Sequence, residues 1–179
     1  MQHINRINRE LKYSGTLFEV YSDTISIPNG NIAHWDFIKH KGAAAVIPIT
    51  DDGKVVMVRQ YRNALDRETL EIPAGGLNPD EPTRDAAARE LEEETGYRSN
   101  DLELLITVAT TVAFCNEKID IYLARNLIQS KQNLDEDEFV EVEEYTVDEL
   151  ADMIYAGKIN DSKTIAAIMA YKDKYVNLK

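Results

Sequence analysis

Much of the chain alternates apolar and polar positions with the two-residue period of half-buried β-strands. Two turn signals interrupt this pattern early on, Pro28-Asn29-Gly30 and Asp51-Asp52-Gly53, and each predicts a hairpin between the strands that flank it. Strands are predicted at residues 17–27, 32–39, 43–49, 55–59, 104–112, 119–124 and 140–145. A loop around residues 114–118 joins two of them.

Three segments carry helical signals instead. Residues 82–95 have a proline near the start and Gly96 just beyond the end, residues 147–156 are amphipathic and stop at Gly157, and residues 161–171 begin with an Asp-Ser cap. The order is strands, one helix, more strands and then two helices. It predicts an α+β fold in which helices pack on a mixed sheet.

Composition adds one unusual number to this picture. The chain has 179 residues, 44% hydrophobic and 29% charged, which is typical of one soluble domain and excludes a disordered or collagen-like chain. Its net charge of −12 comes from two acidic islands, residues 80–94 and 135–149. The remainder of the chain is nearly neutral. The imbalance is therefore a local property rather than a general one.

Several classes of function are disfavoured by the same inventory. Cys115 is the single cysteine, so no intramolecular disulfide forms, which suits a reducing cytoplasm. No run approaches 18 apolar residues, so no membrane span or membrane partner is expected. An acidic chain also lacks the broad basic surface of a nucleic-acid binder.

The first acidic island places three carboxylates on one face of its helix. At 100° per residue, Glu90, Glu93 and Glu94 form a stripe in the last turn, where they repel one another and where the helix dipole disfavours anions. A solvated acidic face is one interpretation. A divalent cation bridging the carboxylates is the other, because Mg²⁺ prefers oxygen ligands.

The surroundings of the stripe favour the cation. Gly75, five residues, Glu81, seven residues and then Arg-Glu-Leu-Glu-Glu-Glu-Thr-Gly-Tyr at 89–97 resemble the Nudix box, GX5EX7REUXEEXGU with U apolar. The resemblance implies a Nudix fold with a mixed β-sheet sandwiched by helices. It also implies Mg²⁺- or Mn²⁺-dependent hydrolysis of a diphosphate linked to another moiety.

The box implies roles for its residues. Glu90, Glu93 and Glu94 bind the metal, together with the carbonyl of Ala74. The spacing of four residues lets Arg89 pair with Glu93 and hold it in place for catalysis. Glu81 supports the site from outside or as an outer ligand. Gly75 allows the substrate to approach the backbone, although a simple turn would explain the glycine equally well.

Beyond the box, residues 42–46, 58–62, 71–75 and 134–142 resemble ADP-ribose pyrophosphatases. In that family an acidic residue on the last of these segments activates the attacking water. Glu136 is the first candidate for this base and Glu138 the second, with an exposed acidic turn as the alternative. Glu117 matches a family glutamate near metal and substrate.

The resemblance also addresses the substrate. Trp35 is similar to a tryptophan that stacks on adenine, although a lone tryptophan is more often part of a core. Arg59 and Arg62 are candidates for binding phosphate or ribose, or else they end a surface strand. Val112 stands where the family usually has a proline, which leaves the sugar end of the substrate open.

Relatives exchange N-terminal strands across a homodimer. The resemblance therefore implies an antiparallel N-terminal extension at residues 1–40 for dimerisation and substrate binding, followed by a Nudix domain at 41–179. The expected function is Mg²⁺-dependent hydrolysis of ADP-ribose to AMP and ribose 5-phosphate. Two alternatives stay open: hydrolysis of another nucleoside diphosphate sugar such as GDP-mannose, and a non-catalytic sensor that binds ADP-ribose.

Overall fold

The computed structural model describes residues 3–134, 136 and 138–177. The chain divides into two compact units, one made of Met1–Gly42 with Ala109–Lys118 and the other of Ala43–Val108 with Ile119–Lys179. The predicted boundary between residues 40 and 41 assigns residues 109–118 to the second part, whereas in the structure they belong to the first unit. None of the helices in the described residues is long and apolar enough to cross a membrane.

The first unit contains an antiparallel sheet in the order β1 (Asn5–Ser14), β2 (Phe18–Ser26) and β3 (Ile32–His40). This is the predicted N-terminal extension. The β2–β3 hairpin closes at Asn29-Gly30, where Gly30 has φ 86° and donates its N–H to Ile27. Strand β1 escaped prediction because it is polar and almost wholly exposed, so it lacks a clear alternation.

The second unit is built around a mixed sheet. Its order is β7 (Ala74–Gly76), β4 (Ala43–Pro48), β10 (Lys118–Arg125) and β9 (Asp101–Ala109), with β4 parallel to β10 and antiparallel to β7. Successive side chains of β4 point to opposite faces. Ala44 and Val46 pack with α1 (Thr83–Thr95). Ala45 and Ile47 join the core formed with α2 (Val147–Tyr155) and α3 (Ser162–Tyr171).

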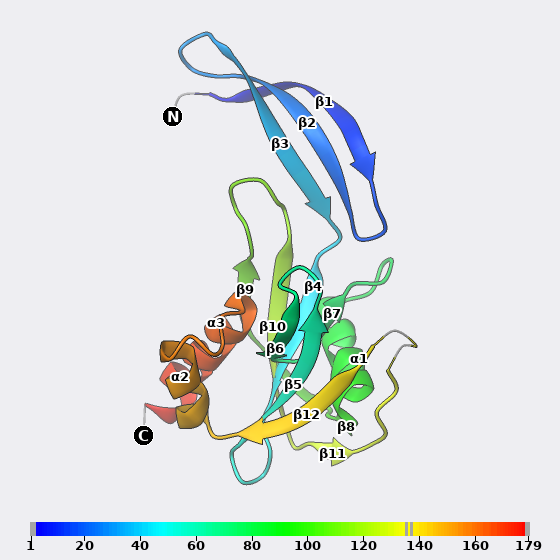
Figure 1. The fold of residues 1–179 in the computed structure, drawn as a ribbon, viewed down its shortest axis with the longest axis vertical. Helices are drawn as coiled ribbons and strands as arrows, with labels where there is room; N and C mark the ends of the chain where they lie inside the picture. The colour runs from blue at the N-terminus through cyan, green and yellow to red at the C-terminus, as the bar shows by residue number, and fades with distance from the viewer. Residues whose placement is uncertain (1–2, 135, 137, 178–179) are drawn as a thin grey trace. The chain divides into compact units, whose positions relative to one another are not determined.

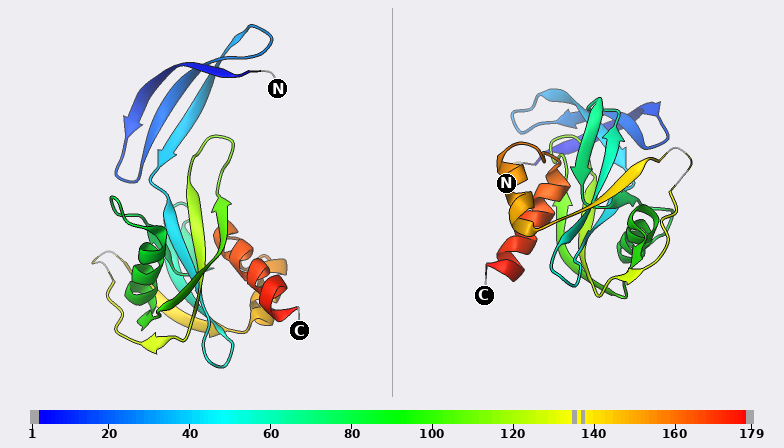
Figure 2. Two further views of the ribbon diagram at one scale, coloured as in Figure 1. Left: turned by 180° about the vertical axis from the view of Figure 1, so that it is seen from behind. Right: turned by 60° about the horizontal axis from the view of Figure 1, so that its bottom comes forward.

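Helices therefore cover both faces of the mixed sheet, as predicted. Figure 1 shows α1 on one side of β4 and the α2–α3 pair on the other, and Figure 2 shows the same layers from behind. The helix ends follow their sequence signals. Gly96 ends α1 at φ 71°, Thr146 and Glu149 form a capping box on α2, and the Asp161 side chain caps α3.

A second sheet lies in the same unit, in the order β12 (Val140–Tyr145), β5 (Val55–Arg62) and β6 (Arg67–Glu71). The hairpin predicted at Asp51-Asp52-Gly53 is corrected here. The bridge Ile49–Val55 does form, but β4 and β5 then enter different sheets because β5 is paired on both edges by β12 and β6.

The remaining elements are short. Strands β8 (Tyr97–Arg98) and β11 (Ile128–Gln129) pair with each other, and a π-helical segment, Lys172–Val176, follows α3. None of these three was predicted, and neither were β6 and β7. Segments of two to five residues are too short to display a period.

Candidate active site

Helix α1 buries two of the three stripe carboxylates. Glu90 is 8% exposed and Glu94 is 3% exposed, whereas the Glu93 side chain is 36% exposed. The helix packs on β4 and β7 through Ala86, Ala87 and Leu91, and Glu90 and Glu94 enter the interior beside these residues. A fully solvated acidic face is therefore ruled out for two of its three members.

Burial changes the acidity of this pair. Burial of the Glu94 carboxyl is the main reason why its pKa is raised to about 8, and the charge of Glu90 raises it further. The hydrogen bond that Glu94 accepts from the Ala74 N–H at 3.2 Å acts in the opposite direction and lowers the pKa. Burial likewise raises the pKa of Glu90. A bound cation would stabilise the ionised forms of these two buried carboxylates.

The backbone of β7 lies directly against Glu90. A Cβ added to Gly75 would stand 1.9 Å from Glu90 Oε1, so only glycine allows this carboxylate its position. A Cβ at Gly76 would meet nothing within 4 Å. Gly75 is therefore more than a turn residue: it makes room for the Glu90 carboxylate.

Arg89 organises the outer part of the cluster. Its guanidinium donates to Glu93 at 2.9 Å, which confirms the pairing predicted from their spacing, and to Glu90 at 2.6 Å. It also donates to both carboxylate oxygens of Glu81, at 2.9 and 3.0 Å. This bond to Arg89 lowers the pKa of Glu81 to about 2. Glu81 reaches the cluster through Arg89.

The donor set suits a hard divalent cation. Carboxylate oxygens on a rigid helix, two of them buried with raised pKa values, are ligands that Mg²⁺ and Mn²⁺ accept. Within the described ranges, no three Asp, Glu, His or Cys side chains already form a metal-ligand group. The Nη1 nitrogen of Arg89 instead bridges Glu90 and Glu93.

A second charged network adjoins the first. Arg62 donates from Nε and Nη2 to both oxygens of buried Glu71, at 2.8 and 2.7 Å. Lys163, at the start of α3, binds Glu71 and Asp161. Burial opposes ionisation of Glu71, but these cations lower its pKa to about 2. The Arg62 charge also acts on Glu94, which places the guanidinium near the carboxylates of α1.

Arg59 is differently placed. It pairs with Glu143 of β12 at 2.5 Å, and because side chains alternate along β5, it lies on the face opposite Arg62. Arg62 is the last residue of β5 and its side chain is 39% exposed, so it does end a strand at the surface while it binds Glu71.

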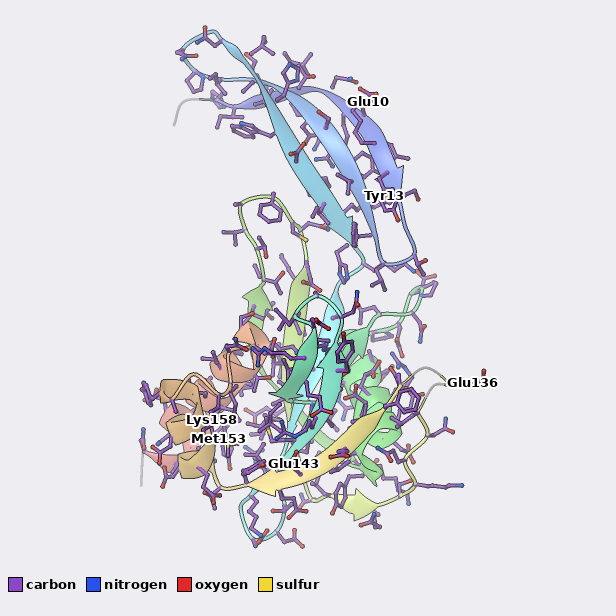
Figure 3. The ribbon with its side chains drawn as sticks, viewed as in Figure 1. Glu10, Tyr13, Glu136, Glu143, Met153 and Lys158 are labelled. Carbon is purple, nitrogen blue, oxygen red and sulfur yellow. The ribbon has the colours of Figure 1, made fainter. Side chains whose placement is uncertain are left out.

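The loop of the second acidic island is fastened to the end of α1. Ser130 N donates to the carbonyl of Gly96 at 2.7 Å, Gln132 Nε2 to that of Glu94 at 2.7 Å and Asn133 N to that of Glu93 at 3.0 Å. Glu136 is exposed on this loop, ahead of Glu143 in β12 (Figure 3). Glu138 is exposed as well, yet its charge raises the pKa values of Glu90 and Glu94.

Two candidates belong to the first unit. Glu117 accepts a hydrogen bond from the Thr110 hydroxyl at 2.7 Å, and its other oxygen lies 3.3 Å from His40 Nδ1. Trp35 is 46% exposed and is therefore not a core residue. It lines a cavity of about 660 Å³ together with Val20, His34, Asp36, Ile38, Ala113 and Phe114.

Sequence reasoning missed Glu71, Lys163 and Asp161. Strands β5 and β6 pair in the register Arg62–Arg67 and Val58–Glu71 around a turn at 63–66. A hairpin prediction with this turn would have placed Glu71 on the same face as Arg62. Lys163 carried no comparable signal, since it lies 92 residues from Glu71 in the chain.

Comparison with known proteins bears on this geometry. The family model described as NUDIX domain matches residues 39–168. A methanol dehydrogenase activator from Bacillus methanolicus is 44% identical over 165 residues, covering 90% of this chain and 89% of that protein. An ADP-ribose pyrophosphatase from Bacillus subtilis is 39% identical over 175 residues, covering 97% and 92%.

The fold has a solved counterpart. A crystal structure described as an ADP compounds hydrolase matches with a TM-score of 0.86 at 24% identity, covering 97% of this chain and 94% of that one. The family match spans most of the chain and includes the carboxylate helix with its glycine-bearing strand. The chain belongs to the Nudix family of hydrolases.

Proposed function

We propose that the protein hydrolyses the diphosphate of ADP-ribose to AMP and ribose 5-phosphate with Mg²⁺ (or Mn²⁺) as cofactor. The observation that carries this proposal is the buried Glu90–Glu94 pair against Gly75, which calls for a cation. The name of the Bacillus subtilis relative, ADP-ribose pyrophosphatase, supports the substrate.

Glu90, Glu93, Glu94 and the carbonyl of Ala74 would hold the metal. A bound divalent ion polarises phosphoryl oxygens and acidifies water. Arg89 keeps Glu93 oriented and is itself oriented by Glu81. Arg62, fixed by Glu71, offers its remaining N–H groups to a phosphate oxygen.

A loop glutamate takes the proton of the attacking water. Glu136 and Glu138 are the two candidates, and the family resemblance places Glu136 first. The base should be identified by kcat: Glu→Gln at the true base should lower kcat about 10²–10⁴-fold with little change in metal affinity. The other variant should remain within a few-fold of wild type.

The decisive experiment is hydrolysis of a panel of nucleotide sugars with Mg²⁺, comparing wild type with Glu94→Gln. Cleavage of ADP-ribose by the wild type and its loss in the variant are expected. If the wild type cleaves no diphosphate, or if the variant is equally active, the enzymatic proposal is wrong.

The same panel addresses the alternatives. Val112 is 84% exposed in the segment where the family usually has a proline, so the sugar end can differ, and preferential cleavage of GDP-mannose would show it. A sensor would instead bind ADP-ribose without cleaving it. The complete box argues against the sensor.

A second candidate function comes from the Bacillus methanolicus relative, whose name is methanol dehydrogenase activator. The 44% identity over 90% of the chain favours testing it. Purified methanol dehydrogenase should be assayed with wild type and with Glu94→Gln. Stimulation by the wild type alone would mean that activation depends on the carboxylate site.

We also propose a cytoplasmic homodimer. The first unit exposes several large apolar side chains in and next to its strands, which a second copy of the chain would cover. These are Ile4, Ile7, Leu11, Tyr13, Leu17, Phe18 and Ile32.

Trp35 and Glu117 are proposed substrate residues, Trp35 for the adenine base.

A further inference from the structure

Gln60 carries a buried side-chain nitrogen that donates to nothing. Its Nε2 is the single buried side-chain nitrogen or oxygen without a hydrogen-bond partner among the residues that the structure describes. Folding removes this nitrogen from water without replacing its lost hydrogen bonds. Such a group in a native fold requires a specific explanation.

The position of Gln60 on β5 suggests one. Side chains two apart share a face, so Gln60 lies on the face of Arg62 and of Glu71, which Arg62 binds from β6. Val55 and Met57 of β5 pack in the core formed with α2 and α3, so Gln60 and Arg62 lie on the opposite face of the strand. Helix α1, which carries the buried carboxylates, contacts both β5 and β12.

Strand β12, which pairs with β5 at Gln60, is also connected to α1. Gln60 is paired in register with Val140 of β12, and the side chain of Gln132 connects the carbonyls of Val140 and Glu94 at 3.4 and 2.7 Å. Val140, the neighbour of Gln60 in β12, is thus connected to the last turn of α1.

A bound ligand would supply the acceptor that Gln60 Nε2 lacks. An anionic oxygen beside Arg62 would accept from a neutral amide and from the guanidinium together. We propose that Gln60 Nε2 donates to a non-bridging oxygen of the bound diphosphate, which makes Gln60 a substrate-binding residue. The identity of this ligand rests on the proposed function.

The test compares Gln60→Met, which keeps the length of the side chain and removes the amide, with Gln132→Met, whose amide has two carbonyl partners. Thermal unfolding is measured without ligand, and calorimetry gives the Kd of inorganic pyrophosphate with Mg²⁺. The KM and kcat for ADP-ribose complete the set.

Gln60→Met should unfold no earlier than wild type, whereas Gln132→Met should unfold earlier. The Kd for pyrophosphate and the KM for ADP-ribose should rise about 10-fold or more in Gln60→Met, as expected for one bond to a charged acceptor. Destabilisation of Gln60→Met equal to that of Gln132→Met would overturn the proposal, and so would an unchanged Kd.

The two proposals fail separately. If the wild type cleaves no nucleotide sugar but its Kd for pyrophosphate still depends on Gln60, the proposed function is wrong and the assignment of Gln60 stands. If ADP-ribose is cleaved with the same KM and pyrophosphate is bound with the same Kd in Gln60→Met, the assignment is wrong and the function stands.

Discussion

Gly75 and Gly76 are neighbours in β7, yet a methyl group added at each would meet different surroundings. In Gly75→Ala the Cβ collides with the Glu90 carboxylate, which must move. We expect kcat/KM for ADP-ribose to fall about 10–100-fold and half-maximal activity to require a higher Mg²⁺ concentration, because a displaced ligand weakens metal binding. Gly76→Ala is the matched control and should stay near wild type. Equal losses in the two variants would contradict this account of Gly75.

Glu94 gives the metal-free protein a pH-dependent stability. Its pKa is raised to about 8 in the fold from 4.5, so the folded state retains a proton that the unfolded state releases. Stability therefore falls as pH rises from about 4.5 to 8, by at most about 1.4 kcal/mol per pH unit. Urea unfolding with a chelator should show this decline. Glu94→Gln should show a smaller decline, with Glu90 accounting for the remainder, and an unchanged slope in the variant would refute the assignment.

The sequence motif identifies the carboxylates but not their surroundings. Glu90 and Glu94 look like a surface stripe on a helical wheel, and their burial depends on how α1 meets β7, a packing of segments that no local pattern encodes. Arg62 was a candidate on residue type alone. Its bond to Glu71 requires the β5–β6 register. Gln60 lies in the segment 58–62 that resembles the family, but nothing in the sequence singles it out from its neighbours.

Among the elements, α3 is joined to β6 by an ion network. Lys163→Met would leave buried Glu71 with Arg62 as its remaining cation, which should destabilise the protein by about 1–3 kcal/mol. Lys54→Met, which breaks an exposed pair with Asp52, is the control and should leave the unfolding midpoint unchanged. Equal effects in urea titrations would show that the network adds nothing.

The same network sets the acid limit of stability. The pKa of Glu71 is lowered from 4.5 to about 2, so its contribution is complete above about 4.5 and is lost as pH falls toward 2. Glu71→Gln should be less stable at neutral pH, and its stability should depend less on pH in this window. A wild-type curve that is equally flat between pH 4.5 and 2 would contradict the lowered pKa.

Helices were more predictable than strand pairing. Each helix has a local signal at one end: Gly96 follows α1, Thr146 caps the start of α2 and Asp161 caps the start of α3. These residues act within one helical turn. Strand partners are chosen at long range, so the signal at Asp51-Asp52-Gly53 fixed the turn but not the sheets that its strands enter.

For the whole molecule we predict a dimer. Sedimentation should give twice the chain mass of 20.3 kDa. Ile7→Lys combined with Leu11→Lys places charge among the exposed apolar residues of β1 and should yield monomers. Leu104→Lys, at an equally exposed position of β9, should remain dimeric. A monomeric wild type would overturn the homodimer.

The loop attachments at Ser130, Gln132 and Asn133 have a consequence for divergence within the family. Three backbone carbonyls of α1 and its cap receive these bonds, so the anchorage depends little on which side chains α1 carries. Insertions or replacements placed after Asn133 would alter the reach and chemistry of the loop while its origin on the carboxylate helix stayed fixed. The anchorage therefore fixes where the loop with the proposed base begins, while its length and side chains after Asn133 are free to vary.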